Sequence, residues 1–259
     1  MRKMDAPYLY DGLEASSYDR VDELADFNDV PFFRLLVDSH PGSVLDLGCG
    51  TGRTLVPLVE DGIDVVGLDS SRSMLDICRG KLERLSLESE LIQGDMRRFK
   101  LERRFASILV PGFSFQMLEK PEDQIACLES CRHHLETGDQ LVLPIYYPWE
   151  MLESDSDESP MEIRKEALGE EGERVVAWQR WKIDRLGQLL YLENRYQRID
   201  AGGKILGDES RSMTLRWEMP YDMQRLLSGC GYSEVEMYGD FEMRPPESDS
   251  ESIIFVARP

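Results

Sequence analysis

The chain has 259 residues, with 30 lysines and arginines against 50 aspartates and glutamates, so its formal net charge is −20. No stretch concentrates basic residues into a stripe that could neutralise a phosphate backbone, so nucleic acid and anionic membrane are excluded as expected partners. The length suits one large α/β domain carrying an appendage, and we expect a monomer or a homodimer.

The beginning of the chain lacks the apolar region of a signal peptide, and no run of about 18 apolar residues occurs, so we expect a cytoplasmic protein. Five cysteines form an odd number without a CxxC pair, which suits a reducing compartment. With only three histidines in addition, no metal site is predicted.

Residues 1–40 are predicted to form an N-terminal helical segment that acts as a lid. Three aromatic residues, Tyr8, Tyr10 and Tyr18, precede a helical spacing of apolar residues that is interrupted near Pro31. The apolar residues with this spacing are Leu24, Phe27, Phe32, Leu35 and Leu36.

Residues 41–149 alternate between strand and helix patterns, which predicts a parallel sheet with right-handed crossovers. The predicted strands are 43–47, 64–69, 90–95, 105–110 and 140–147. The predicted helices are 51–62, 70–85 and 121–138, the first of them short or kinked because it contains Pro57.

The pattern changes after this core. Residues 150–173 carry ten acidic and two basic residues, which predicts an acidic linker or flap. Residues 174–219 contain three segments with period-two alternation and predict an antiparallel insertion, a β-meander. Residues 220–259 read as a helix and two strands that complete a seven-stranded mixed sheet. The expected fold class is therefore α/β, Rossmann-like, with helices on both faces and a small antiparallel appendage.

The stretch "SVLDLGCGTGR" at residues 43–53 places a glycine-rich turn between a buried strand and a helix, where α/β proteins bind nucleotides. The dinucleotide fingerprint has a third glycine or alanine where this chain has Arg53. Asp46 would repel a pyrophosphate but attract an ammonium or sulfonium group. Asp69 and Asp95 end the next two strands, where they can accept hydrogen bonds from a ribose diol and an adenine amino group. An amino acid joined to adenosine satisfies all three carboxylates.

The stretches "VLDLGCGTGR", "VVGLDSSRSML", "IQGDMRRF" and "LETGDQLVL" resemble the successive motifs of class I S-adenosylmethionine-dependent methyltransferases. The resemblance implies S-adenosylmethionine as cofactor, S-adenosylhomocysteine as product, and in-line methyl transfer to an oxygen or nitrogen nucleophile of a small molecule. It also implies which residues bind the cofactor: Asp46, Gly48, Cys49 and Gly50 at the methionine end, Asp69 at the ribose, and Ser70, Met74, Asp95, Met96 and Val110 around the adenine or beside it. Cys49 itself reads as a small packing residue rather than a nucleophile.

The loop at residues 110–120 should border the acceptor. It lacks the Asn/Asp-Pro-Pro pattern of DNA amino-methyltransferases and looks like the Ser-Ser-x-x-His-Leu loop of bacterial small-molecule methyltransferases, including amino-sugar N-methyltransferases, except that Met117 replaces the histidine. Tyr8, Tyr10 and Tyr18 are candidates for acceptor binding or proton handling, and the catalytic residues are otherwise unassigned. Aromatic residues of the meander that could wall an acceptor chamber are Trp178, Trp181, Tyr191, Tyr196 and Trp217.

Three alternatives stay open at this point. A nicotinamide-dependent oxidoreductase is disfavoured by Arg53 and Asp46. A binding or regulatory protein could keep the cofactor pocket without turnover. A protein methyltransferase could use residues 150–173 to engage a basic partner.

Overall fold

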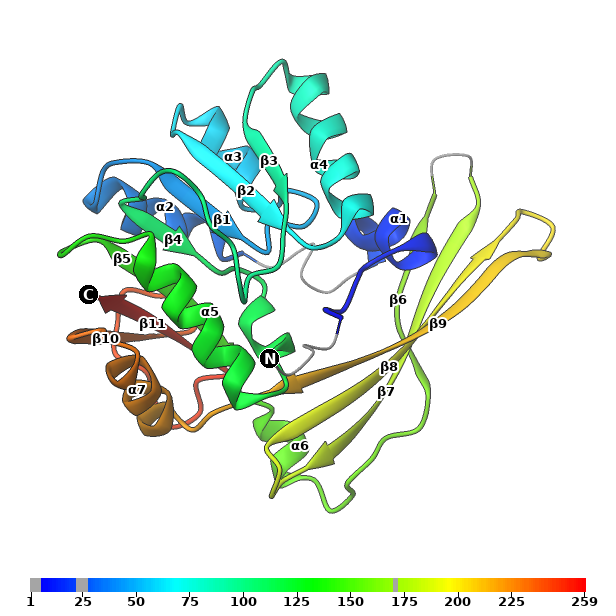
Figure 1. Ribbon diagram of the computed structural model, residues 1–259. Coiled ribbons are helices and arrows are strands. Elements are labelled where there is room, and N and C mark those ends of the chain that lie inside the picture. The colour runs from blue at the N-terminus through cyan, green and yellow to red at the C-terminus, as the bar shows by residue number, and fades with distance from the viewer. Residues whose placement is uncertain (1–5, 22–27, 170–171) are drawn as a thin grey trace.

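The computed structural model describes residues 6–21, 28–169 and 172–259. Within these ranges the chain forms a seven-stranded sheet covered by helices on both faces, sheet A, and a separate four-stranded antiparallel sheet, sheet B (Figure 1). The expected fold class is confirmed. Two residues of the predicted N-terminal helix, Leu24 and Phe27, lie outside the described ranges.

Sheet A has the strand order β10-β11-β5-β4-β1-β2-β3, in which β11 runs antiparallel to both neighbours and the other pairings among β1 to β5 are parallel. Its strands are β1 (Val44–Leu47), β2 (Val65–Asp69), β3 (Glu90–Gln93), β4 (Ser107–Leu109), β5 (Gln140–Tyr146), β10 (Glu234–Gly239) and β11 (Ser252–Arg258). The strand order changes direction between β1 and β4. The loops that follow these two strands therefore diverge at the carboxyl edge, which is where open α/β sheets bind ligands.

The helices of the described chain are α1 (Gly12–Val21), α2 (Val30–Ser39), α3 (Leu55–Glu60), α4 (Arg72–Leu85), α5 (Pro121–His133), α6 (Trp149–Glu153) and α7 (Pro220–Gly229), with a 3₁₀ helix, η2, at Ser114–Met117. Pro31 does not interrupt α2 but lies in its first turn. A proline is tolerated there because its missing N–H has no partner within the helix. Pro57 leaves α3 short, as predicted.

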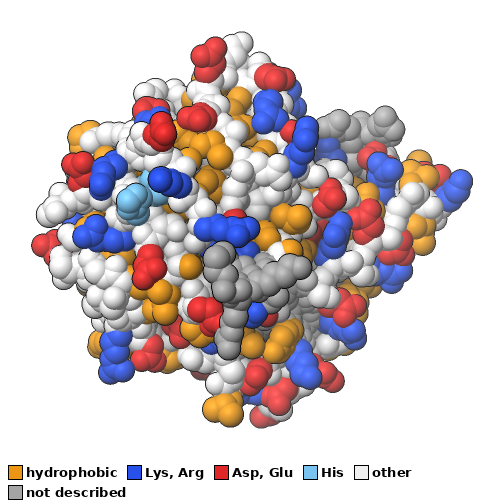
Figure 2. Space-filling model, viewed as in Figure 1, with side chains coloured by type: hydrophobic (Ala, Val, Ile, Leu, Met, Phe, Trp, Pro, Cys, Tyr) orange, Lys and Arg blue, Asp and Glu red, His pale blue; other side chains and the backbone are white. Residues whose placement is uncertain are grey.

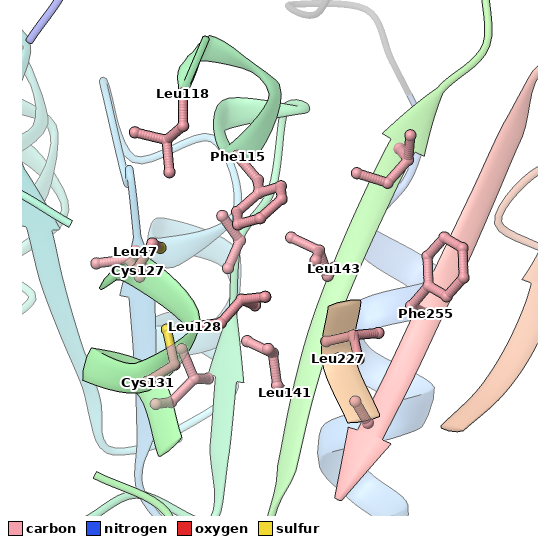
Figure 3. Packing of buried hydrophobic residues seen from close by; sticks show 14 of the residues in the cluster. Leu47, Phe115, Leu118, Cys127, Leu128, Cys131, Leu141, Leu143, Leu227 and Phe255 are labelled. Carbon is pink, nitrogen blue, oxygen red and sulfur yellow. The ribbon is translucent and has the colours of Figure 1, made fainter. Parts of the chain in front are cut away.

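The two faces of sheet A are covered by different helices, and the strand residues alternate between them. Leu141 and Leu143 of β5 pack in the cluster that contains α5 and α7, whereas Val142 packs with α2, α3 and α4. Figure 3 shows the first cluster, with Leu128 of α5 and Leu227 of α7 against the strands. Both faces are thus buried, which is why the central strands are apolar almost throughout.

Sheet B corrects the prediction for residues 150–173. It contains β6 (Glu162–Leu168), β7 (Arg174–Asp184), β8 (Leu189–Ile199) and β9 (Ile205–Arg216), in that order. The acidic segment contains α6 and β6, and β6 pairs with β7 as a fourth strand. The acidic composition misled the prediction because an edge strand satisfies its backbone through one neighbour and tolerates charged side chains that discourage further pairing.

Helix α1 packs on sheet B through Val21, Val175, Ala177 and Tyr196, and so joins the N-terminal residues to the appendage. Figure 2 shows acidic and basic side chains interspersed over one face of the molecule. Among the described helices, none is both long and apolar enough to cross a membrane.

Candidate active site

A pocket lies at the carboxyl edge of sheet A. The loops after β1, β2, β3 and β4 form one side of it, and the N-terminal strap (residues 6–21) and the middle of β9 form the other. It encloses about 1390 Å³, its open mouth included.

Eight of the ten residues predicted to bind the cofactor line this pocket. They are Gly48, Cys49, Gly50, Asp69, Ser70, Met74, Asp95 and Met96. The motifs around these residues are separated in the sequence, and the parallel order of β1, β2 and β3 brings them to one edge.

The glycine loop after β1 needs its glycines for conformation and for space. Gly48 has a φ of 81°, and a Cβ there would lie 2.9 Å from the Ser114 Oγ and 3.6 Å from the Met96 Cε, all in the pocket wall. Gly52 has a φ of 83°, and a Cβ there would lie 2.6 Å from the Cys78 Sγ of α4. The loop therefore presents bare backbone to the pocket on one side and packs closely on α4 on the other.

Asp69, at the end of β2, is held by backbone groups. Its carboxylate accepts hydrogen bonds from the Gly50 N–H at 2.9 Å and the Ser71 N–H at 2.7 Å. Burial raises the pKa of Asp69, and these hydrogen bonds oppose the rise. A carboxylate has about four acceptor sites, so Asp69 keeps acceptor capacity for a ligand.

Asp95, which follows β3, accepts hydrogen bonds from the Arg97 side chain. The Arg97 Nε lies 2.9 Å from the Asp95 Oδ1, and its Nη2 lies 2.6 Å from the Asp95 Oδ2. Burial favours a raised pKa for Asp95, but the hydrogen bonds from Arg97 outweigh burial and lower that pKa. Asp95 therefore stays ionised as an acceptor.

Two predicted cofactor residues, Asp46 and Val110, are fully buried and do not line the pocket. Alternation along β1 turns Asp46 toward the helices α2 to α4, on the side of Val44. Neither carboxylate oxygen of Asp46 has a hydrogen-bond partner among the described residues, and burial raises its pKa to about 8. Burial thus favours the neutral form of Asp46 and opposes the expected attraction of an ionised carboxylate for an ammonium group.

Cys49 lines the pocket but is 5% exposed and belongs to the core cluster beneath the loop. Burial raises the pKa of its thiol well above the ordinary value. The protonated thiol supports the packing role rather than a nucleophilic one.

The structure brings Tyr8, Tyr10 and Tyr18 into the pocket wall, where their rings meet edge to face in sequence, at 5.1 Å and 5.5 Å between centroids. The Ser71 hydroxyl, which caps α4, donates to the Tyr10 carbonyl at 2.5 Å. The strap is thereby tied to the cofactor side of the pocket.

The strap is also tied to sheet B by a buried carboxylate. Glu14 is fully buried and accepts a hydrogen bond from the Tyr8 hydroxyl at 2.7 Å, with the Tyr196 hydroxyl of β8 at 3.4 Å. The Leu13 N–H at the start of α1 donates to Glu209 of β9 at 2.9 Å. Polar anchors from sheet B therefore set the position of Tyr8.

The predicted aromatic chamber is wrong. None of its five residues is part of the pocket lining; Trp217 and Tyr196, for example, are buried in core clusters, and Tyr191 is exposed. The side of sheet B that reaches the pocket contributes Ser212, Met213 and Thr214 of β9 instead. Period-two alternation revealed two faces of each strand but not which of them meets sheet A.

Arg53 and Thr54 are pocket residues that the sequence analysis did not assign to the site. Asp29, which is fully buried, forms an ion pair with Arg53 and holds it at the pocket wall. Burial by itself lowers the pKa of the guanidinium, but the hydrogen bond and the charge of Asp29 outweigh burial and raise that pKa. The Thr54 Oγ1 is buried without a hydrogen-bond partner among the described residues. In the sequence, Arg53 argues against a dinucleotide; a cation in the glycine loop also indicates a binding site for an anionic group of the ligand.

Residues 44–138 match the protein family described as the methyltransferase domain. The cypemycin N-terminal methyltransferase of a Streptomyces species is 32% identical over 160 residues, which cover 60% of this chain and 63% of that protein. The dTDP-3-amino-3,4,6-trideoxy-α-D-glucopyranose N,N-dimethyltransferase of Streptomyces venezuelae is 35% identical over 115 residues, which cover 44% of this chain and 46% of that protein. The chain thus spans less than two thirds of the length of these curated relatives.

Solved structures extend the likeness over nearly the whole chain. The CcbJ methyltransferase of Streptomyces caelestis is 25% identical with a TM-score of 0.75, covering 94% of this chain and 95% of that one. An S-adenosylmethionine-dependent methyltransferase of Clostridium acetobutylicum has a TM-score of 0.76 at 17% identity, with 94% and 96% covered, and so shares the fold. On the motifs, the sheet order and these matches together, the chain carries a methyltransferase domain at residues 44–138 and has the fold of class I S-adenosylmethionine-dependent methyltransferases.

Proposed function

We propose that this protein transfers the methyl group of S-adenosylmethionine to an amine nitrogen of a small molecule. The observation that carries the proposal is the single pocket in which the glycine loop, Asp69 and Asp95 share one space with Ser114, Met117 and Met213. The first group matches the cofactor motifs, and the second lines a region beside them that is open to another molecule. When bound, the cofactor supplies an electrophilic methyl group on a sulfonium.

The described residues fit the cofactor chemically. The absent side chain at Gly48 leaves space between Ser114 and Met96 in the pocket wall. We assign Asp69 to the ribose diol, Asp95 to the adenine amino group, and Arg53 to the carboxylate of the methionine end.

The rest of the reaction depends on positioning. Methyl transfer from a sulfonium is an in-line displacement, so holding the acceptor close to the methyl carbon and excluding water supply most of the rate. Tyr8, Tyr10 and Tyr18 cover the pocket from the strap, and Ser114 and Met117 of η2 face them from the sheet A side. These groups orient the acceptor and shield it from solvent.

We choose a nitrogen acceptor over an oxygen acceptor, which is compatible with the lack of an imidazole in the described pocket. No histidine lines the described pocket, and Met117 stands where similar loops have one. A neutral amine attacks with its own lone pair, whereas a hydroxyl needs a base to remove its proton. The relatives named above that act on an amino terminus or an amino sugar support the same choice.

We further propose a cytoplasmic protein that acts as a monomer or homodimer without nucleic acid. Five free cysteines support a reducing compartment, and the interspersed surface charges in Figure 2 support a small-molecule partner. The role of residues 150–173 as a binding arm for a basic protein loses its basis, because β6 is built into sheet B.

Calorimetric titration with S-adenosylmethionine, S-adenosylhomocysteine and NADH tests the cofactor. We expect micromolar binding of the first two and none of the third; NADH binding alone would overturn the proposal. A panel of primary amines and their hydroxyl counterparts, followed by mass spectrometry, then tests the acceptor. A gain of one methylene unit on amines supports a nitrogen acceptor, gain on the alcohols alone contradicts it, and binding without turnover on any acceptor indicates a regulatory protein.

A further inference from the structure

Arg97 stands out among the charged residues of the pocket because its guanidinium is nearly enclosed and lies between two carboxylates. Its side chain is 4% exposed, between Asp95 and Asp123, whose side chains are 13% and 14% exposed. It contacts Asp95 through Nε and Nη2 and Asp123 through Nη1 at 3.0 Å. The geometry with Asp95 is the two-pronged pairing by which arginine fixes the plane of a carboxylate.

The backbone around this ion triad is also fixed. The Arg97 N–H donates to the Asp95 Oδ1 at 3.0 Å, and the Arg97 carbonyl accepts from the Ser130 hydroxyl of α5 at 3.1 Å. Asp123 lies in the first turn of α5, where the helix N-terminus favours a carboxylate. The loop after β3 and helix α5 therefore hold Arg97 from two directions.

We infer that Arg97 is a positioning residue that sets the plane of the Asp95 carboxylate, and thereby makes the pocket select adenine over bases without a 6-amino group. This rests on the proposed function, in which Asp95 accepts a hydrogen bond from the adenine amino group. The Asp95 Oδ1 accepts from both the N–H and the Nε of Arg97, so the acceptor capacity that remains lies at Oδ2, whose direction the Arg97 Nη2 fixes. A base with a carbonyl oxygen at position 6 places one hydrogen-bond acceptor against another, the ionised Asp95 carboxylate. We therefore expect such a base to bind less tightly.

The test compares two ligands that differ at that position. S-adenosylhomocysteine carries the 6-amino group, and S-inosylhomocysteine carries a carbonyl oxygen there. We expect the native protein to bind the adenosine compound at least about tenfold more tightly, measured as a ratio of calorimetric Kd values. Arg97→Lys keeps the charge but loses the two-pronged geometry, and we expect it to cut that ratio to a third or less.

A neighbouring arginine gives a matched control. Arg98 is 69% exposed, and its Nε lies 4.0 Å from the same Asp95 Oδ2, so Arg98→Lys should leave the ratio unchanged. If Arg97→Lys does not fold, Asp123→Asn serves instead, because it releases the guanidinium on its far side and should lower the ratio by a smaller amount.

Three results would overturn the inference: no preference in the native protein, an unchanged ratio in a folded Arg97→Lys or Asp123→Asn protein, or an equal loss of affinity for both ligands. The last result would indicate a purely structural role. Failure of the proposed function is distinguishable, because then the native protein would bind neither ligand.

Discussion

The two halves of the pocket are built differently. The cofactor half comes from consecutive strand-loop-helix units of sheet A, and its side chains are held by nearby backbone groups, as the Gly50 and Ser71 N–H groups hold Asp69. The acceptor half joins the strap, η2 and β9, whose members are distant in sequence; the bond from Leu13 to Glu209 spans 196 positions. The cofactor half is therefore set by local motifs, and the acceptor half by how sheet B and the strap dock on the core.

The largest effect is expected where the two halves touch. Gly48→Ala adds a Cβ 2.9 Å from the Ser114 Oγ at a φ of 81°, so it strains the loop and pushes η2 away from the cofactor. Displacement of reacting groups by about 1 Å costs about 100-fold in rate, and we expect a loss of that size in kcat/KM.

Gly138→Ala is the control for strain alone. Gly138 has a φ of 96° but no atom within 4 Å of its added Cβ, so this variant should lose about 1–2 kcal/mol of stability while keeping its activity. Equal losses of activity in the two variants would mean that backbone strain alone, and not the contact between residue 48 and Ser114, lowers the activity.

The next effect isolates the cofactor half. Asp69→Ala removes the acceptor assigned to the ribose and leaves the Gly50 and Ser71 N–H groups without it. We expect S-adenosylmethionine binding to weaken by about 1–3 kcal/mol, or about 5- to 150-fold in Kd by calorimetry. Asp76→Ala, on the exposed side of α4, should bind normally. Unchanged affinity in folded Asp69→Ala protein would remove Asp69 from the site.

A smaller effect isolates the acceptor half. Glu14→Gln keeps the shape of the buried side chain but removes the charge that binds the Tyr8 hydroxyl, and should cost about 1–2 kcal/mol of stability in denaturant unfolding. The acceptor KM should rise more than the Kd for S-adenosylmethionine, because the strap is tied to sheet B through this group. Glu83→Gln on α4 is an exposed control. A larger effect on the cofactor Kd than on the acceptor KM would contradict the division into halves.

The last effect is on stability and leaves activity least affected; it concerns Asp46, behind the cofactor half. It ionises near 3.8 when unfolded and near 8 when folded, so folding takes up a proton between these values. Its stabilising contribution is present at low pH and is lost as the pH rises toward 8 and beyond. We expect the stability of the native protein relative to Asp46→Asn to fall by about 3–4 kcal/mol from about pH 5 to about pH 8, measured by denaturant unfolding, because each unit of pKa difference corresponds to about 1.4 kcal/mol. Parallel pH profiles for the two proteins would show that Asp46 ionises normally.

The sequence was sufficient for most of the cofactor half. The strand that ends before Gly48, the aspartate at the end of β2 and the one after β3 follow from local patterns, and parallel pairing then brings these motifs to one edge. It was insufficient for Asp46, because the direction of one buried side chain depends on which helices cover that face. The strand β6 was missed because its pairing with β7 is a tertiary property that acidic composition does not report.

By itself, the sequence determined the fold of sheet A and the position of the glycine loop at its carboxyl edge, where we propose that the cofactor binds, because strand-loop-helix units encode their geometry within about twenty residues. Only the tertiary structure decided that Met213 rather than the predicted aromatic residues faces the pocket, that Glu14 joins the strap to sheet B, and that Arg97 holds Asp95 and Asp123 together. The physical reason is that these contacts depend on how separate layers dock, and a period-two or helical pattern shows that a segment has two faces without showing what each face will meet.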